Sequence, residues 1–358
     1  MSDSIRKQIQ ARESQFLSPL ATKAAQSLGR QTPEAEDPVR TCFQRDRDRI
    51  LHAKSFRRLK HKTQVFIDPL GDHYRTRLTH TLEVAQISRT IGRALRLNED
   101  LIEAIALGHD VGHSPFGHAG ERALDEAIKE YWFRKEGTNS NDQDSLPMES
   151  DSWHEPRHFR HYEQSLRIVD VLEHLNLTEE VRLGIGGHSK GRKDLSAKDG
   201  EPVSSLEAAV VKVSDRIAYL NHDIDDALRS GIIDSVPSEF KILGTTYSQR
   251  IGILVQDVIT QSVDQPFVRV SQPFLDKMNM LKEWMFDNVY LRYPIIFPDV
   301  EKAENLLKEL FVHFLADGTL PEGYVGLQGA VDYVAGMTDR FAIETYEHLK
   351  LPAAWERR

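Results

Sequence analysis

Residues 107–121 read LGHDVGHSPFGHAGE and hold three histidines and two carboxylates within fifteen positions. Imidazole and carboxylate groups are common ligands of divalent metal ions, and an imidazole also transfers protons near neutral pH. The helix-breaking residues Gly112, Pro115 and Gly117 divide the segment, which indicates a turn between two helices. These residue types and their spacing predict a metal-binding or acid–base site at a helix junction.

Two other segments place a ligand-type side chain on an apolar helix face. The apolar stripe of residues 78–97 extends back to His80, and Asp215 interrupts the apolar face of residues 205–229. A lone histidine on such a face is more often an ordinary core residue. A buried carboxylate, however, needs a cation or several hydrogen-bond donors to be stable, so Asp215 points to a partner.

Together the three segments supply four inward-pointing ligands, which are His80, His109, Asp110 and Asp215. This set suits a divalent ion such as Mn²⁺, Fe²⁺ or Co²⁺, with Mg²⁺, Ni²⁺ and Zn²⁺ as alternatives. A bound ion of this kind lowers the pKa of water and polarises a phosphoryl oxygen. The residues alone therefore favour a helical metallohydrolase.

Helical periodicity dominates the rest of the chain, and no series of alternating strand patterns stands out. Helices are expected over residues 78–97, 98–110, 119–132, 160–175, 205–229, 301–318 and 327–349. The polar segments 133–156 and 189–202 are expected to be surface loops, the first a candidate lid. We expect an all-α fold, in which one large domain (1–358) contains a metal-site core (55–232) and a C-terminal helical extension (233–358).

The composition is that of an ordinary soluble protein. The chain has 358 residues, 40% of them hydrophobic and 28% charged, with a formal net charge of −9. Its single cysteine, Cys42, excludes an internal disulfide and a cysteine-built zinc site. No run of 18 apolar residues and no signal-like N-terminal segment occurs, so we expect a cytoplasmic protein that does not enter a membrane.

A basic stretch contrasts with this acidity. Residues 40–62 contain nine Lys or Arg and two Asp, which gives a local charge of +7 on a chain of −9. Such a stripe is typical of polyanion binding, but an ion-paired helix face explains it equally well.

The ligand pattern lies within blocks that resemble a known family. The blocks are FQRDRDRILHAKSFRRLKHKTQVF (43–66), RTRLTHTLEVAQISRTIGRAL (75–95), GHDVGHSPFGHAGE (108–121), HYEQSLRIV (161–169), VSDRIAYLNHDIDDA (213–227) and DYVAGMTDRFA (332–342). They resemble the bacterial deoxyguanosinetriphosphate triphosphohydrolase-like proteins of the HD superfamily of metal-dependent phosphohydrolases. The resemblance implies an HD-domain core and hydrolysis of dGTP or another dNTP at the α-phosphate to deoxynucleoside and tripolyphosphate. It also implies a homo-oligomer, tetrameric or hexameric, and an activating dNTP.

The resemblance also implies roles for single residues. The metal ligands would be His80, His109, Asp110 and Asp215. The catalytic set would be His118 with Glu121 as an acid–base pair, and His113 as a phosphate-positioning residue. The substrate-binding set would be Arg77 on phosphate, Tyr219 and Asp223 on the deoxyribose, and Gln64 and His161 at the edge of the site. Tyr162 stands where relatives commonly have Asn, which leaves the substrate edge near His161 less defined.

Two rival functions stay open at this point. One is an HD phosphohydrolase of nucleoside monophosphates or other phosphate esters. The other is a regulator that binds dNTP or single-stranded DNA, for which the basic stretch is the motivation. The remaining histidines, among them His188 and His222, are interpreted as structural or surface residues.

Overall fold

The computed structural model describes residues 4–64, 75–136, 155–188, 204–316 and 318–352. Over these residues the chain is helical, with two isolated β-bridges and no strand, which confirms the predicted all-α class. None of the described helices is long and apolar enough to cross a membrane.

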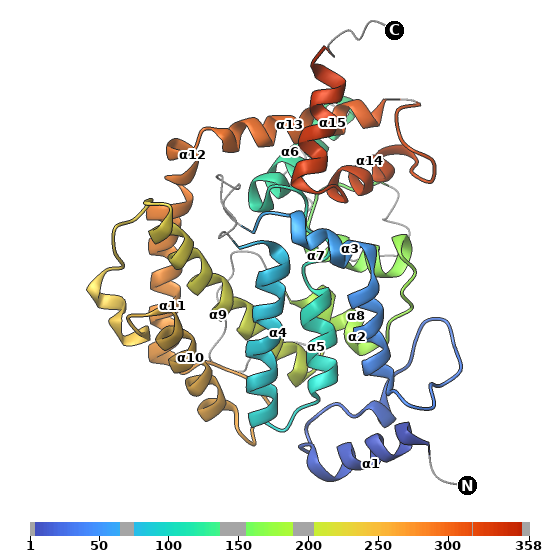
Figure 1. Ribbon diagram of the computed structural model, residues 1–358, viewed down its shortest axis with the longest axis vertical. Helices are drawn as coiled ribbons and strands as arrows, with labels where there is room; N and C mark the ends of the chain where they lie inside the picture. Colours follow the sequence, from blue (N-terminus) through green and yellow to red (C-terminus); the bar gives the residue numbers. More distant parts are fainter. Residues whose placement is uncertain (1–3, 65–74, 137–154, 189–203, 317, 353–358) are drawn as a thin grey trace, which may run out of the picture.

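The helices are arranged as Figure 1 shows. In chain order they are α1 (Ile5–Phe16), η1 (Ala24–Gln26), α2 (Cys42–His52), α3 (Lys54–Arg58), η2 (Leu59–His61), α4 (Arg77–Ala94), α5 (Glu99–Gly108), α6 (Gly117–Glu136), α7 (His161–Arg167), η4 (Ile168–Leu172), α8 (Glu179–Gly187), α9 (Leu206–Arg229), η5 (Ser238–Leu243), α10 (Tyr247–Ser262), α11 (Gln272–Met285), η6 (Phe286–Tyr290), α12 (Tyr293–Ile296), α13 (Asp299–Leu315), α14 (Gly326–Ala335) and α15 (Asp339–Lys350).

The three helices that carry the predicted ligands pack against one another. Helix α4 contacts both α5 and α9, and α2 covers a further side of α5 (Figure 1). Their shared core contains Ile50, Ile87, Ile105 and Val211, each no more than 1% exposed. Because an amphipathic helix is held mainly by burial of its apolar face, this core fixes how the three ligand-bearing helices approach one another.

Polar caps set where these helices begin. The side chain of Thr76 accepts from the backbone N–H of Thr79 at the start of α4, and Asn98 accepts from Leu101 at the start of α5. Ser205 caps α9 in the same way. Such caps satisfy backbone donors that have no partner within the helix, so each start is encoded locally.

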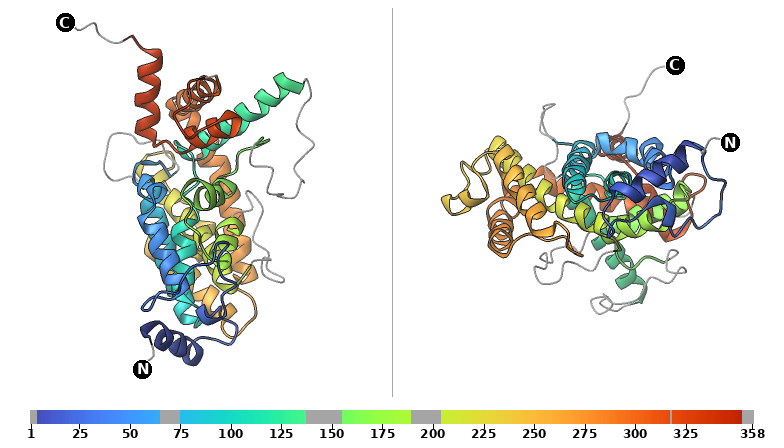
Figure 2. Two further views of the ribbon diagram at one scale, coloured as in Figure 1. Left: turned by 90° about the vertical axis from the view of Figure 1, so that its right-hand side faces the viewer. Right: turned by 90° about the horizontal axis from the view of Figure 1, so that it is seen from below.

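A second apolar cluster joins α6 to the C-terminal helices. It includes Leu124 and Ile128 of α6, Leu307 of α13 and Val331 of α14. Helix α6 packs against α13, and the left view of Figure 2 places both at the same end of the molecule as α15. The first cluster instead continues through α10 and α11 as far as Val300. The expected division into residues 55–232 and 233–358 stays a prediction.

The expected helix over 327–349 is wrong, because the structure has two helices there. Helix α14 ends at Ala335 and α15 begins at Asp339, with the Thr338 side chain accepting from the N–H of Phe341. The pair Thr338-Asp339 is a helix-start signal that interrupts a continuous apolar periodicity.

The two predicted loops fall mostly outside the described residues. Of 133–156, residues 133–136 form the last turn of α6 and residues 137–154 are not described. Residues 189–202 are not described either.

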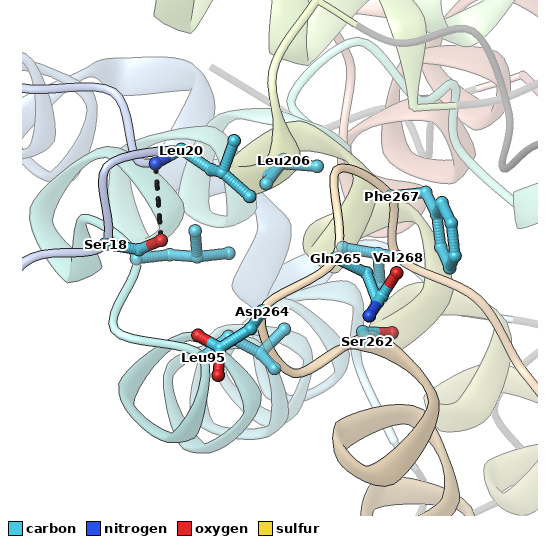
Figure 3. Close-up of a pocket in the computed structure, with 10 residues that line it drawn as sticks. Ser18, Leu20, Leu95, Leu206, Ser262, Asp264, Gln265, Phe267 and Val268 are labelled. Atoms are coloured by element: carbon cyan, nitrogen blue, oxygen red, sulfur yellow. Dashed lines mark hydrogen bonds between the residues drawn. The ribbon is translucent and has the colours of Figure 1, made fainter.

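A small hollow lies beyond the C-terminal end of α4, where Leu95, Leu206 and Phe267 line it (Figure 3). Leu95 is fifteen residues after His80 along the chain, which corresponds to about 22 Å at 1.5 Å per helical residue. The hollow is therefore separate from the predicted metal ligands.

The close approach of α5 and α8 depends on Gly184. A Cβ at this position would lie 2.5 Å from Cδ1 of the buried Ile105. We predict that Gly184→Ala lowers the free energy of unfolding by about 1–3 kcal/mol through overpacking, although Ala is the better helix former. Gly187→Ala on the same helix is the matched control, since a Cβ there meets no described atom within 4 Å and Ala should stabilise by up to about 1 kcal/mol. Urea unfolding measures both; equal effects of the two substitutions would contradict the packing account.

Candidate metal centre and active site

The four predicted metal ligands lie together where α4, α5 and α9 meet. The Nε2 of His80 is 3.0 Å from Oδ1 of Asp215 and 3.8 Å from Oδ2 of Asp110. The Nε2 of His109 is 3.4 Å from Oδ1 of Asp110 and 3.9 Å from Oδ1 of Asp215. Two imidazoles and two carboxylates thus surround one point with their ligand atoms.

The ring of His109 is oriented for a ligand on Nε2. Its Nδ1 lies 2.6 Å from the carbonyl oxygen of Ala106, and this contact makes Nδ1 the donor and leaves Nε2 with a lone pair. That Nε2 is buried and has no hydrogen-bond partner. Because buried polar atoms are normally paired, this orphaned atom and its two neighbouring carboxylates fit a divalent cation.

The charges of the cluster shift its protonation. Burial opposes ionisation of Asp110, but the neighbouring histidines and Arg77 hold the pKa of this carboxyl well below its usual range. Burial also opposes the charged form of His80, yet the hydrogen bond to Asp215 raises the pKa of that imidazole. Burial opposes ionisation of Asp215 too, but the hydrogen bond to His80 and the charge of His109 lower the pKa of that carboxyl, so both aspartates are ionised, as metal ligands must be.

Arg77 stands beside the ligands and is 1% exposed. Its Nη1 donates to Oδ2 of Asp110 at 2.7 Å, and its Nη2 donates to the backbone oxygen of Gln64 at 3.3 Å. The Nε of Arg77 and the side-chain oxygen of Gln64 are both buried without a partner. Both residues thus have polar atoms available for a ligand next to the metal cluster.

A second histidine cluster adjoins the first through Asp110. The Nε2 of His113 is 3.3 Å from Oδ1 of Asp110, and its Nδ1 has no partner. The His113 ring stacks on that of His161 with a centroid distance of 3.9 Å and an interplanar angle of 13°. The ligand atoms of Asp110, His113 and His161 all lie within 4.8 Å of one another, so this cluster also suits a cation.

Glu121 lies between two histidines. Its Oε1 is 2.9 Å from Nδ1 of His161, whereas its Oε2 is 3.6 Å from Nδ1 of His118. Burial opposes ionisation, but His161 and His118 hold the pKa of Glu121 well below its usual range. The predicted partner His118 is the more distant one, and its side chain is 59% exposed. His161, predicted as a substrate residue, is thus the closer partner of the carboxylate.

Gly112 explains how His161 reaches His113. A Cβ on Gly112 would lie 2.2 Å from the backbone N of Ser165, so the backbone of α7 packs directly on the turn. The N–H of Gly112 donates to Oγ of Ser165 at 2.9 Å, and this hydroxyl donates to the carbonyl of His109 at 2.8 Å. A side chain at position 112 would move α7 and its histidine away.

Tyr219 and Asp223 follow Asp215 along α9. Asp223 is 3% exposed; its Oδ2 accepts from the hydroxyl of Tyr290, and its Oδ1 is buried without a partner. Burial raises the pKa of Asp223 to about 7. Tyr219 is partly buried, and the Arg216 guanidinium lies 5.3 Å from the centroid of its ring. This side of the site thus offers a free carboxyl oxygen and two phenols.

The C-terminal helices hold the histidine-bearing turn in place. Oδ1 and Oδ2 of Asp339, the first residue of α15, accept from the N–H groups of Phe116 and Thr63, each at 2.9 Å. The buried ammonium of Lys62 donates to the carbonyls of His113 and Ala335. Burial lowers the pKa of Lys62 to about 7. Residues from both ends of the chain therefore meet at the turn.

Asp332 of α14 holds α7. It accepts two bonds from the Arg167 guanidinium, at 2.7 and 2.8 Å, and one from the side chain of Gln164 at 3.0 Å. A bidentate Arg–carboxylate pair fixes orientation as well as distance. The helix that carries His161 is thus tied to the C-terminal region.

Four of the nine basic residues in the stretch 40–62 form ion pairs with other described residues, and all four lie within residues 40–49. Arg40 pairs with Asp48 at 2.8 Å, Arg47 with Asp100 at 3.0 Å, and Arg49 with Glu34 at 2.7 Å. The ion-paired interpretation therefore fits residues 40–49 and, among the described contacts, does not extend to the basic residues of 54–62.

Sequence reasoning missed several residues that lie against the site. The Nε2 of His188 is 3.3 Å from Nε2 of His161, and the Nδ1 of His222 is 3.2 Å from Nδ1 of His80. His222 directly precedes Asp223, and that adjacency was a usable signal. Tyr290 gave none, because 67 positions separate it from Asp223.

Comparison with known proteins agrees with this arrangement. A model of the HD domain matches residues 77–220, and a model of the phosphohydrolase-associated domain matches residues 268–348. The fold and the matched segment define an HD-domain protein.

Curated relatives match nearly the whole chain. Proteins called deoxyguanosinetriphosphate triphosphohydrolase-like protein are 46% identical in Caldanaerobacter subterraneus subsp. tengcongensis (96% of this chain and 95% of the relative) and 45% identical in Desulfatibacillum aliphaticivorans (97% and 98%). One from Clostridium perfringens is 41% identical (97% and 98%). The chain belongs to this family of HD-domain hydrolases, as the resemblance predicted.

Asp339 provides a test of the C-terminal support. We predict that Asp339→Asn lowers the free energy of unfolding by about 1–3 kcal/mol, because an amide can accept only one of the two N–H groups and leaves the other unpaired. Glu344→Gln, which changes an exposed partner of Arg340, is the control and should stay within about 0.5 kcal/mol. Urea unfolding of both variants measures the difference, and equal stabilities would contradict this role.

The raised pKa of Asp223 predicts a pH-dependent stability. Its folded pKa of about 7 lies above the ordinary 3.8, so the folded state retains a proton that the unfolded chain has lost. The contribution of this carboxyl to the free energy of unfolding must therefore fall by up to about 4 kcal/mol as the pH rises from 4 to 7. Above pH 7 this contribution should stay constant. We expect the stability of Asp223→Asn relative to the wild type to rise over this interval. A difference that stays constant from pH 4 to 8 would refute the assignment.

Proposed function

We propose that the chain hydrolyses deoxynucleoside triphosphates at the α-phosphorus, giving deoxynucleoside and tripolyphosphate. The observation that carries the proposal is the set of unpaired, buried polar atoms beside the predicted metal cluster and along α9, in a chain whose relatives are named triphosphohydrolase-like. These atoms belong to Gln64, Arg77, His109, His113 and Asp223. They include both donors and acceptors, as a nucleotide with anionic phosphates and a hydroxylated sugar requires.

His80, His109, Asp110 and Asp215 would hold a divalent ion, for which Mn²⁺, Fe²⁺ and Co²⁺ are suitable. When bound, such an ion supplies a Lewis acid for the phosphate and lowers the pKa of water. The four side chains contribute two negative charges and two neutral imidazoles, so the complex with the ion is close to neutral. This neutrality would offset the desolvation of the buried Asp110 and the partly buried Asp215.

The triphosphate would lie against Arg77 and His113. A guanidinium keeps its charge at all relevant pH values, and Arg77 already lies beside Asp110 with its Nε unpaired. His113 presents an unpaired Nδ1 on this side, and since its neutral ring has a single N–H, it would donate to a phosphate oxygen with that N–H on Nδ1 instead of on the nitrogen that faces Asp110. These contacts would hold the α-phosphorus next to the metal cluster and lower the charge repulsion against an attacking oxygen.

Proton transfer would fall to the histidines around Glu121. Hydrolysis adds the oxygen of water to the α-phosphorus and breaks the bond to the 5′ oxygen, which then takes up a proton. Glu121 would orient His118 for this donation, as the family pattern suggests, and its 2.9 Å contact would hold His161 in place. Because His118 is the exposed member, a bound nucleotide can reach it without displacing the core.

The sugar would bind along α9. The free Oδ1 of Asp223 can accept from the 3′-hydroxyl, and Tyr219 lies one helical turn closer to the metal cluster. Tyr290 fixes the other oxygen of Asp223. This arrangement explains why a carboxyl group would be placed in so buried a position.

The test is product analysis of the purified chain with Mn²⁺ and each dNTP in ¹⁸O-labelled water. We expect deoxynucleoside and labelled tripolyphosphate, no turnover for His109→Ala, and a loss of about 10²- to 10⁴-fold for His118→Ala. Release of pyrophosphate or orthophosphate would overturn the proposed bond. Hydrolysis of nucleoside monophosphates alone would favour the rival phosphohydrolase, and binding of single-stranded DNA without turnover would favour the regulator.

A further inference from the structure

The second nitrogen of His80 makes a contact that the proposed reaction does not use. While Nε2 faces Asp215 and Asp110, Nδ1 lies 3.2 Å from Nδ1 of His222. The two rings meet edge to face, with a centroid distance of 5.3 Å and an interplanar angle of 85°. His222 is fully buried, and its Nε2 contacts Oε2 of Glu83. A continuous series of contacts therefore connects His80 through His222 to the carboxylate of Glu83.

Only one placement of the protons in this series of contacts is compatible with metal binding by His80. A neutral imidazole has one N–H and one lone pair, and Nε2 of His80 needs the lone pair to coordinate an ion. The N–H of His80 is then on Nδ1 and donates to Nδ1 of His222. His222 must consequently hold its own N–H on Nε2, which is the nitrogen that contacts Glu83. The carboxylate is an acceptor only, so it favours this placement over the reverse.

Glu83 is itself held in position. The hydroxyl of Tyr247, the first residue of α10, donates to its Oε2 at 3.2 Å, and Nε of Arg75 lies 3.6 Å away. The Tyr247 ring stacks over the His222 ring with an interplanar angle of 17°. The Arg75 guanidinium lies 5.0 Å from the centroid of the Tyr247 ring. Helix α10 lies outside both ranges that match known domains. The position of Glu83 thus depends on a segment that those two domains do not include.

We propose that His222 and Glu83 are positioning residues that fix the tautomer and ring orientation of His80 for metal binding. The inference rests on the metal site of the proposed function. Carboxylate partners of metal-binding histidines typically change metal affinity by 10- to 100-fold, because they orient the ring and raise its basicity. Here one further imidazole transmits the effect of the carboxylate to the ligand.

The experiment compares Co²⁺ binding to the chelator-treated full-length protein. Glu83→Gln removes the charge and keeps the shape, and His222→Phe keeps a ring but removes both nitrogens. Asp225→Asn is the matched control, since Asp225 contacts the same Arg75 at 3.0 Å and the substitution leaves the His80–His222–Glu83 contacts in place. His80→Ala tests the metal site itself. Thermal unfolding of each metal-free variant checks that the fold is retained.

We expect Glu83→Gln and His222→Phe to weaken Co²⁺ binding by about 10- to 100-fold, and Asp225→Asn to bind like the wild type. In the Co²⁺-loaded wild type, the paramagnetically shifted N–H proton of His80 should exchange slowly with water, and Glu83→Gln should accelerate that exchange. A purely structural role would move neither the affinity nor this signal in a folded variant.

The outcomes separate the two proposals. If His80→Ala weakens binding while Glu83→Gln and His222→Phe bind Co²⁺ like the wild type, the positioning role is overturned and the metal site stands. If His80→Ala binds like the wild type, or the wild type binds no Co²⁺, the metal site fails and the positioning role fails with it. Should His222→Phe not fold, Glu83→Gln alone decides between these results.

Discussion

Two aspartates where three helices meet, Asp110 buried and Asp215 partly buried, are the constraint on which the rest of this structure depends. Asp110 and Asp215 lie where α4, α5 and α9 meet, and each faces the imidazoles of His80 and His109. Carboxylates taken out of water need compensation that hydrogen bonds from neutral groups only partly give. A divalent ion between the four ligands would complete this compensation. The same few residues therefore determine both the ligand geometry and the packing of the three helices.

The site also depends on segments far from the ligands. Asp339 and Lys62 hold the turn that carries His113, and Asp332 holds the helix that carries His161. The region that matches the phosphohydrolase-associated domain therefore supports the same stacked histidines that adjoin the metal cluster. On the opposite side, Tyr247 of α10 supports Glu83. The metal cluster thus has supports from both of its sides and from both halves of the chain.

The sequence predicted what depends on local periodicity and on residue type. The all-α class and the turn after Asp110 follow from apolar spacing, caps and helix breakers, and the family follows from the resemblance of the sequence blocks. The four ligands could be grouped because each interrupts or ends an apolar face. The contacts of His222 could not be predicted, since periodicity gives the face of a helix but not the side chain that it meets. The same reason hid the 2.9 Å contact between Glu121 and His161, which are 40 positions apart.

The most direct test of the account is anomalous diffraction at the manganese edge from crystals of the Mn²⁺-loaded protein. The account predicts one strong peak enclosed by His80, His109, Asp110 and Asp215, at ordinary coordination distances from all four. A peak confined to His113 and His161, or no peak among the four ligands at full Mn²⁺ loading, would contradict it.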